Sequence, residues 1–280
     1  MRRFRDRVGG WLIYVVAAAL SVLFLLPLVW VLSTSFKPNT EIYTTHMRFW
    51  PKQPTLGHYL GLVSALPQFR DYILNSVVVT VFSVAGVLAI AALAAYPLAR
   101  LRFRGRNLIR SFVLLAVAIP YILYLIPIYV MESDTNLLNT IPGLVLPYIA
   151  LNLPLAILLM EGSYRTIPPD FEEAASIDGC SPLRAWWSVV LPLAGPGVAA
   201  VVIFTFVAVW QEFMFAVTLF GSGNNTTFPV GITFLQSEAQ SYAFGQLSGT
   251  VVIAILPALV IFLLLQKYFV KGLVEGGLKG

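Results

Sequence analysis

Six long apolar runs divide the sequence, and they constrain its fold more than any other feature. They cover residues 11–32, 73–99, 108–131, 141–160, 198–220 and 249–266. A helix needs roughly 20 apolar residues to cross the hydrocarbon core of a bilayer, so each run is long enough for one span. The chain is 58% hydrophobic and only 11% charged, whereas about a quarter of the residues in soluble domains are charged. The sequence therefore predicts an all-α membrane protein with six transmembrane helices, in a single domain over residues 1–280.

Basic residues are distributed unevenly between the segments that join these runs. With the N-terminus in the cytoplasm, the cytoplasmic segments hold fourteen Lys and Arg residues and the outer segments hold four. Cytoplasmic loops of membrane proteins carry an excess of these residues, so the distribution sets the orientation. It predicts that both termini and the segment 163–196 are cytoplasmic. It also accounts for the net charge of +5 without a nucleic-acid partner.

The segment 163–196, between the fourth and fifth runs, is polar and contains signals that start and stop helices. Proline cannot continue a helix, so Pro168 is expected to end the helix that precedes it. Asp170 and Glu173 are spaced as a capping box, which would start a short helix. Gly179 is placed to end that helix in the left-handed conformation.

A second short helix is predicted directly after this bend. Ser181 suits the N-cap position and Pro182 the first helical position. An apolar face then recurs at helical spacing, formed by Leu183, Trp186, Trp187 and Val190. Pro192 is expected to end this helix. The segment is thus predicted to form two short helices joined by a tight bend.

The segment 163–196 resembles the EAA loop of permease subunits in ABC importers. The run Glu173-Ala174-Ala175-x-x-Asp178-Gly179 is followed by Leu191-Pro192-x-x-x-Pro196. The run Trp210-Gln211-Glu212-Phe213 and the end of the chain, Gly272 to Gly280, are similar to the carbohydrate branch, which includes the smaller permease subunit of the maltose transporter. Cys180 departs from the alanine usual in the family, and Gln211 departs from an asparagine-like position.

The resemblance implies a transport subunit rather than an enzyme. Such a permease forms half of the translocation pathway for a sugar, meaning an oligosaccharide, disaccharide or polyol, delivered by an extracytoplasmic binding protein. The implied partners are a second homologous permease subunit and two ATP-binding subunits, which would hold ATP and Mg. The sequence contains no G-x-x-x-x-G-K-[ST] motif, so no cofactor is expected on this chain. The implied location is a bacterial or archaeal plasma (inner) membrane, crossed several times.

The resemblance also implies four groups of site residues. Coupling to the ATP-binding subunit is expected from Glu172, Glu173, Ala174, Ala175, Asp178, Gly179, Leu183 and Pro192. A C-terminal tail at the interface of the ATP-binding subunits would comprise Glu275, Gly276, Gly277, Lys279 and Gly280. Candidates for the lining of the pathway are Asn75, Trp210, Gln211 and Glu212. Candidates for contact with the binding protein are Gln236, Ser237, Glu238, Ala239, Gln240 and Tyr242.

Several of these residues also have a purely structural interpretation. Glu173 could act only as a helix-capping residue, and Asp178 with Gly179 could serve only to form the bend. Glu212 lies within an apolar run, where an ionisable group is costly and normally faces a cavity or a partner. A structural hydrogen bond from Glu212 to a neighbouring helix is the alternative. Asn75 fits packing between helices as well as contact with a sugar.

Other classes of function were weighed against the importer. The nearest alternative is an ABC importer for a solute that is not a sugar. A self-sufficient secondary transporter would usually show inverted repeats and broken helices with ion ligands, and no obvious repeat is present in the sequence. Two histidines and one cysteine are too few for a catalytic set or a metal site, so neither is expected.

Overall fold

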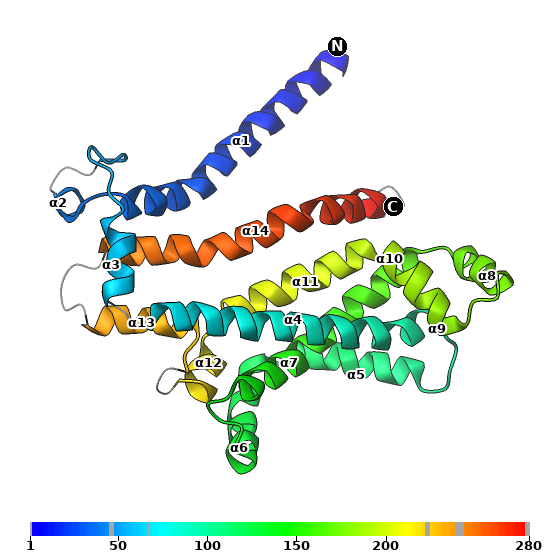
Figure 1. The fold of residues 1–280 in the computed structure, drawn as a ribbon. Helices are drawn as coiled ribbons and strands as arrows, with labels where there is room; N and C mark the ends of the chain where they lie inside the picture. The colour runs from blue at the N-terminus through cyan, green and yellow to red at the C-terminus, as the bar shows by residue number, and fades with distance from the viewer. Residues whose placement is uncertain (1, 45–47, 66–67, 222–224, 239–243, 278–280) are drawn as a thin grey trace. The chain divides into compact units, whose positions relative to one another are not determined.

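The computed structural model describes residues 2–44, 48–65, 68–221, 225–238 and 244–277, and every regular element within these ranges is helical (Figure 1). Internal contacts divide the chain into two units. The first combines Met1–Pro67 with Ile232–Leu256, and the second combines Gln68–Gly231 with Pro257–Gly280. The all-helical prediction is confirmed for the described residues.

Four described helices are long and apolar enough to cross a membrane. They are Ile13–Ser35, Phe69–Arg100, Ile141–Thr166 and Phe244–Tyr268. Two further candidates are bent pairs, Arg106–Ala118 with Tyr121–Thr135 at 94° and Pro182–Leu193 with Gly195–Trp210 at 74°. The described residues therefore contain four candidate spans, or up to six if each bent pair is one span.

Two of the predicted runs are interrupted in the structure. The third run is divided into α5 (Arg106–Ala118) and the pair η1 (Tyr121–Tyr124) and α6 (Leu125–Thr135). Pro120 causes this break, because Ile119 before it is extended, with ψ 125°. The fifth run is divided into α11 (Gly195–Trp210) and α12 (Met214–Leu219). Each of these two runs therefore contains a break, and whether each bent pair is one span stays a prediction.

The first unit contains α1 (Arg2–Ser35), α2 (Asn39–Ile42), α3 (Gly57–Ala65) and parts of α13 (Phe228–Glu238) and α14 (Phe244–Gly277). A buried contact joins the end of α1 to α3, where the Nε2 atom of His58 lies 2.7 Å from the carbonyl oxygen of Lys37. The hydroxyl of Tyr59 donates to the Oγ atom of Ser35 at 2.7 Å. The segment after α1 is thus tied to α3 by polar contacts.

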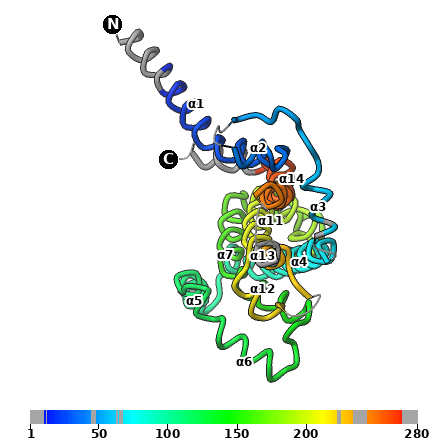
Figure 2. The backbone as a smooth tube through the Cα atoms, turned by 90° about the vertical axis from the view of Figure 1, so that its left-hand side faces the viewer, coloured from blue at the N-terminus to red at the C-terminus, as the bar shows by residue number. Residues whose placement is uncertain are grey.

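The second unit is built on α4 (Phe69–Arg100), α7 (Ile141–Thr166) and α11, which pack against one another (Figure 1). Figure 2 shows α5 beside α7. Glycine permits close packing of α11 on α7, because a Cβ atom at Gly197 would overlap Ser163. Buried apolar side chains fill the space between these helices, including Val87, Met160 and Val201. This packed group carries both of the sites described next.

Candidate functional site

The bend predicted in the segment 163–196 is present. The first short helix is α8 (Asp170–Ile177), and Gly179 after it has φ +79°. A residue with a side chain is strained at this φ, so glycine is the natural choice. The second helix, α9 (Pro182–Ala185), begins after Ser181, whose Oγ atom accepts a hydrogen bond from the backbone nitrogen of Arg184 at 3.4 Å. The left-handed glycine and the serine N-cap are both confirmed.

Two details of this segment were predicted wrongly. The capping box does not form, because Pro169 occupies the N-cap position of α8 and Asp170 already lies inside the helix. Pro192 does not end the second helix, because Trp186–Val190 forms a π-helical turn, η2, that leads into α10 (Leu191–Leu193). Wider turns of this kind accommodate a residue that cannot donate a backbone hydrogen bond.

A polar cluster anchors α8 to the end of α4. The Oε1 atom of Glu172 lies 2.6 Å from the Nε atom of Arg100, and its Oε2 atom accepts a hydrogen bond from the Tyr96 hydroxyl at 2.6 Å. Arg100 also donates to the carbonyl oxygen of Ile167 at 2.7 Å. The hydrogen bonds from Tyr96 to Glu172 and from Arg100 to Ile167 each involve one charged group, and such bonds are stronger than neutral ones. The helix α8 is therefore held on the packed group of helices by its second acidic residue.

A second buried connection fixes the π-helical turn η2. The indole nitrogen of Trp186 donates to the hydroxyl of Tyr164 at 3.0 Å, and that hydroxyl donates to the carbonyl oxygen of Ala92 at 3.0 Å. All three residues are buried. This chain of hydrogen bonds links η2 to both α7 and α4.

The outer surface of the same segment is apolar and exposed. Large exposed side chains occur at Phe171, Ile177 and Leu183, with 87% of Ile177 and 67% of Leu183 accessible. Glu173, Ala174, Asp178 and Gly179 are also exposed, whereas Ala175 is buried. Exposed apolar groups rimmed by polar residues are typical of surfaces that bind another protein. Adjacent glutamates thus have different environments, with Glu172 turned inward and Glu173 at the surface.

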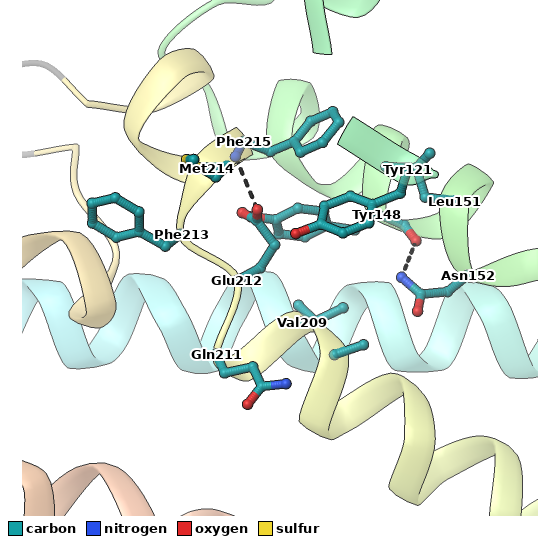
Figure 3. A pocket seen from close by; sticks show the side chains of 11 residues that line it. Tyr121, Tyr148, Leu151, Asn152, Val209, Gln211, Glu212, Phe213, Met214 and Phe215 are labelled. Carbon is teal, nitrogen blue, oxygen red and sulfur yellow. Dashed lines mark hydrogen bonds between the residues drawn. The ribbon is translucent and has the colours of Figure 1, made fainter. Parts of the chain in front are cut away.

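A second site surrounds the break between α11 and α12. The hydroxyl of Tyr148 donates to the Oε2 atom of Glu212 at 2.5 Å. The carboxylate also accepts hydrogen bonds from the backbone nitrogen of Phe215 at 2.9 Å (Figure 3) and from that of Ala216 at 3.0 Å. These nitrogens belong to the first turn of α12, where N–H groups lack partners within the helix. Glu212 therefore caps α12, which fits the structural hydrogen bond considered as its alternative role.

The four candidate pathway residues do not share one environment. Gln211 and Glu212 line a common pocket with Tyr121, Tyr148 and Asn152. The side chain of Asn75 donates to the carbonyl oxygen of Thr226 at 3.1 Å, and buried Trp210 stacks on Phe206 with a centroid separation of 5.7 Å. The structure thus brings two of the four together at this pocket.

Several predicted contact residues have no described side-chain environment. In the tail, Glu275, Gly276 and Gly277 belong to α14 by their backbone, and Lys279 and Gly280 lie outside the described residues. In the outer loop, Gln236, Ser237 and Glu238 belong to the end of α13, and Ala239, Gln240 and Tyr242 lie outside the described residues. The expected roles of these residues stay predictions.

Sequence reasoning missed the residues that hold these sites in place. Arg100 was assigned only to the basic cluster that sets orientation, and Tyr96, Tyr121 and Tyr148 were not singled out. Each tyrosine lies in or beside an apolar run, where its hydroxyl group needs a hydrogen-bond partner once buried. This need for a hydrogen-bond partner was the one signal in the sequence that could have pointed to Tyr96, Tyr121 and Tyr148. Among the described residues, no cluster of three or more His, Cys, Asp or Glu side chains could hold a metal ion.

Residues 87–275 match the protein family described as the binding-protein-dependent transport system inner membrane component. The chain belongs to this family. The match covers α4 from residue 87 onward, α7, α11 and the α8–α9 segment, so both sites described above lie within it. The recognition of an importer permease from the EAA-like residues is confirmed, and the chain is a multi-pass membrane permease.

Two relatives of this permease align along most of its length. The sulfoquinovosyl glycerol transport system permease protein SmoH of Agrobacterium fabrum is 36% identical over 272 residues, which cover 97% of this chain and 95% of SmoH. The diacetylchitobiose uptake system permease protein NgcG of Streptomyces coelicolor is 33% identical over 257 residues, covering 91% of this chain and 84% of NgcG. Both relatives are named as permeases of transport systems.

The fold of this permease is also found in a solved structure. One chain in the crystal structure of a bacterial ABC transporter involved in the import of the acidic polysaccharide alginate matches it with a TM-score of 0.81. The match covers 94% of this permease and 97% of that chain, at 23% sequence identity. At this identity the likeness concerns the fold alone.

Proposed function

We propose that this permease forms half of the translocation pathway for a sugar, in an ATP-driven importer that receives its substrate from an extracytoplasmic binding protein. The importer would also contain a second homologous permease and two ATP-binding subunits. The observation that carries this proposal is the α8–α9 segment, which is anchored firmly to the packed helices and exposes an apolar surface. Such a segment can pass a movement of a bound partner to the helices behind it.

The substrate class is supported by what the relatives transport. SmoH is named for sulfoquinovosyl glycerol and NgcG for diacetylchitobiose, and both are sugar derivatives. Each relative aligns along more than nine-tenths of this chain at over 30% identity. We therefore assign an oligosaccharide, disaccharide or polyol rather than a solute of another class.

The membrane topology of the proposal has six spans with both termini in the cytoplasm. Each bent pair then counts as one span, and the excess of Lys and Arg on the segments assigned to the cytoplasm supports this orientation. The same orientation places α8 and α9 on the cytoplasmic side, where ATP is available to a partner subunit. The membrane would be a bacterial or archaeal plasma membrane.

Coupling would run from the ATP-binding subunit through the exposed surface of α8 and α9 to α4 and α7. Phe171, Ile177 and Leu183 supply apolar contact area, and Glu173 supplies a surface charge beside them. The Glu172–Arg100 pair and the Trp186–Tyr164 hydrogen bond would transmit the displacement. ATP and Mg would be held by the partner and not by this chain.

The test is co-purification from detergent-solubilised membranes with a tagged chain. Wild type is expected to bring down an ATP-binding subunit and a second permease, and Glu173→Lys is expected to lose the ATP-binding subunit or to hydrolyse ATP without transport. Asp134→Lys is the matched control, because Asp134 is also exposed but lies in α6, away from the α8–α9 segment. If the chain is isolated alone, or if Glu173→Lys behaves as wild type, the coupling role is wrong.

A further inference from the structure

A pocket of about 430 Å³ opens beside the break between α11 and α12 (Figure 3). Its lining comes from η1, α7, the end of α11, residues 211–213 and the start of α12. Pockets for small molecules occupy roughly 300–1,000 Å³ and combine apolar walls with a few polar groups. We propose that this pocket is a subsite for an uncharged sugar ring, so that this permease itself contacts the substrate. The proposal rests on the function proposed above and narrows its substrate to neutral saccharides, in contrast to the sulfonated sugar for which the relative SmoH is named.

An aromatic pair forms one wall of the pocket. The rings of Tyr121 and Phe215 stack, with centroids 5.9 Å apart and an angle of 28° between their planes. Phe215 is fully buried and 52% of Tyr121 is exposed, so the buried ring supports the exposed one from behind. A pyranose has an apolar face of C–H groups, which an aromatic ring can cover and remove from water. Tyr121 is therefore placed to receive that face.

The only ionisable carboxylate of the lining is already engaged by its own chain. Glu212 accepts hydrogen bonds from the Tyr148 hydroxyl and from the backbone nitrogens of Phe215 and Ala216. Figure 3 shows this carboxyl group turned toward the Phe215 nitrogen and away from Gln211. A group with three donors of its own has little capacity left for a ligand. Glu212 is thus a positioning residue that holds the shape of the pocket.

The charge of the lining excludes anionic sugars from this subsite. None of the 11 lining residues is Lys or Arg. A carboxylate or sulfonate on a sugar would enter beside Glu212 without a cation to balance it, and burying an unpaired charge is costly. The hydroxyl groups of a neutral sugar meet no such penalty. The pocket therefore selects against acidic saccharides on this side of the pathway.

Two amide side chains supply hydrogen bonds suited to hydroxyl groups. Gln211 is exposed at the pocket, and Asn152 is half-buried there. Asn152 donates one N–H to the carbonyl oxygen of Tyr148 at 2.8 Å, which uses one of its two N–H groups. An amide presents both donors and acceptors, so it can pair with a hydroxyl in either direction.

The experiment uses membrane vesicles that contain the complete importer and its binding protein. Uptake is measured for radiolabelled trehalose and maltose as neutral probes and for a disaccharide containing glucuronic acid as an acidic probe, each well below the concentration that saturates uptake. Tyr121→Ala is expected to reduce neutral uptake about tenfold, a loss of about 1.4 kcal/mol, whereas Tyr121→Phe retains it. The matched control is Tyr129→Ala, because Tyr129 is an exposed tyrosine of α6 that does not line the pocket.

A second variant keeps the test independent of folding defects. Gln211 is exposed, so Gln211→Arg should assemble normally, and it is expected to lower neutral uptake and raise the ratio of acidic to neutral uptake. A purely structural role for Gln211 would leave this ratio unchanged and would overturn the subsite. The same holds if Tyr121→Ala takes up neutral sugars as wild type does.

The outcome for wild type separates the two proposals. If wild-type vesicles take up no oligosaccharide, disaccharide or polyol that their binding protein binds, neutral or acidic, the function proposed above is wrong. If wild type takes up only the acidic probe, sugar import stands and the neutral subsite is overturned. If wild type prefers neutral probes and both variants behave as expected, this permease contributes directly to the recognition of its substrate.

Discussion

The Nε atom of Arg100, at the end of α4, lies 2.6 Å from the Oε1 atom of Glu172 in α8. Both side chains are largely buried, with 13% and 19% of their surfaces accessible. Seventy-two positions separate them along the chain, so the pair joins two elements that have no local connection. The pair fixes the α8–α9 segment on α4, which is one of the helices that this segment is proposed to move.

The first prediction concerns this pair. Glu172→Gln and Arg100→Gln are each expected to cost about 1–3 kcal/mol, because each leaves a partly buried charge without its partner. The double variant should cost less than the sum of the two. Thermal unfolding of the purified complex, analysed as a double-mutant cycle, measures this coupling. Additive losses would mean that the two side chains do not interact in the assembled protein.

The second prediction compares two positive-φ glycines. Gly179 and Gly105 have φ +79° and +90°, and a Cβ atom at either would meet nothing within 4 Å. Alanine should therefore cost about 1–2 kcal/mol at both positions through backbone strain alone. Only Gly179→Ala changes the bend of the proposed coupling segment, so it alone should reduce sugar uptake per ATP hydrolysed. Equal effects of the two variants on this ratio would argue against a role of the bend in coupling.

The third prediction concerns the packing of α11 on α7. A Cβ atom at Gly197 would overlap the side chain of Ser163, whereas one at Gly162 would meet nothing within 4 Å. Gly197→Ala should destabilise the protein by about 1–3 kcal/mol, since overpacking forces neighbouring groups to move. Gly162→Ala should be neutral or stabilising by up to about 1 kcal/mol, because alanine favours the helix. Melting temperatures of the two variants in the same detergent test this difference.

The fourth prediction concerns buried Glu161 of α7, which pairs with Arg110 of α5 and with Arg165 four residues along its own helix. Arg110→Ala removes a connection between two helices and should cost about 1–3 kcal/mol. The Arg165 side chain is 45% exposed, so Arg165→Ala should cost only about 0.3–0.5 kcal/mol. A larger loss for Arg165→Ala in thermal unfolding would contradict this ranking.

The sequence predicted those parts of the fold that depend on local signals. Runs of apolar residues predict spans because the bilayer imposes their length, and Gly179 predicts a bend because few other residues adopt its conformation. The breaks were harder to predict. Pro120 interrupts its run, whereas Pro147 and Pro154 lie inside the continuous helix α7. The effect of each proline depends on its packing partners, which the local sequence does not contain.

The candidate sites were predicted only in part, for the same reason. Glu212 was noticed because an acid in an apolar run requires a partner, but its partner Tyr148 lies 64 positions earlier. The Tyr96–Glu172 hydrogen bond spans 76 positions. Pairings at this distance follow from the way α4, α7 and α11 pack, and no spacing rule within one helix indicates them. The local pairing of Ser181 with Arg184 was predicted correctly, whereas the local capping box of Asp170 and Glu173 was not.

The cap that Glu212 provides for α12 has a consequence for the hydration of the break. Unwound backbone in a bilayer attracts water wherever its polar groups lack partners, and a continuous file of water conducts protons. The Glu212 carboxylate accepts hydrogen bonds from two backbone N–H groups beyond the break, and the Tyr148 hydroxyl donates to the same carboxylate. The helix can therefore be broken here without recruiting water for these groups. The hydrogen bonds of these two groups therefore do not depend on whether water or a solute fills the pocket beside them.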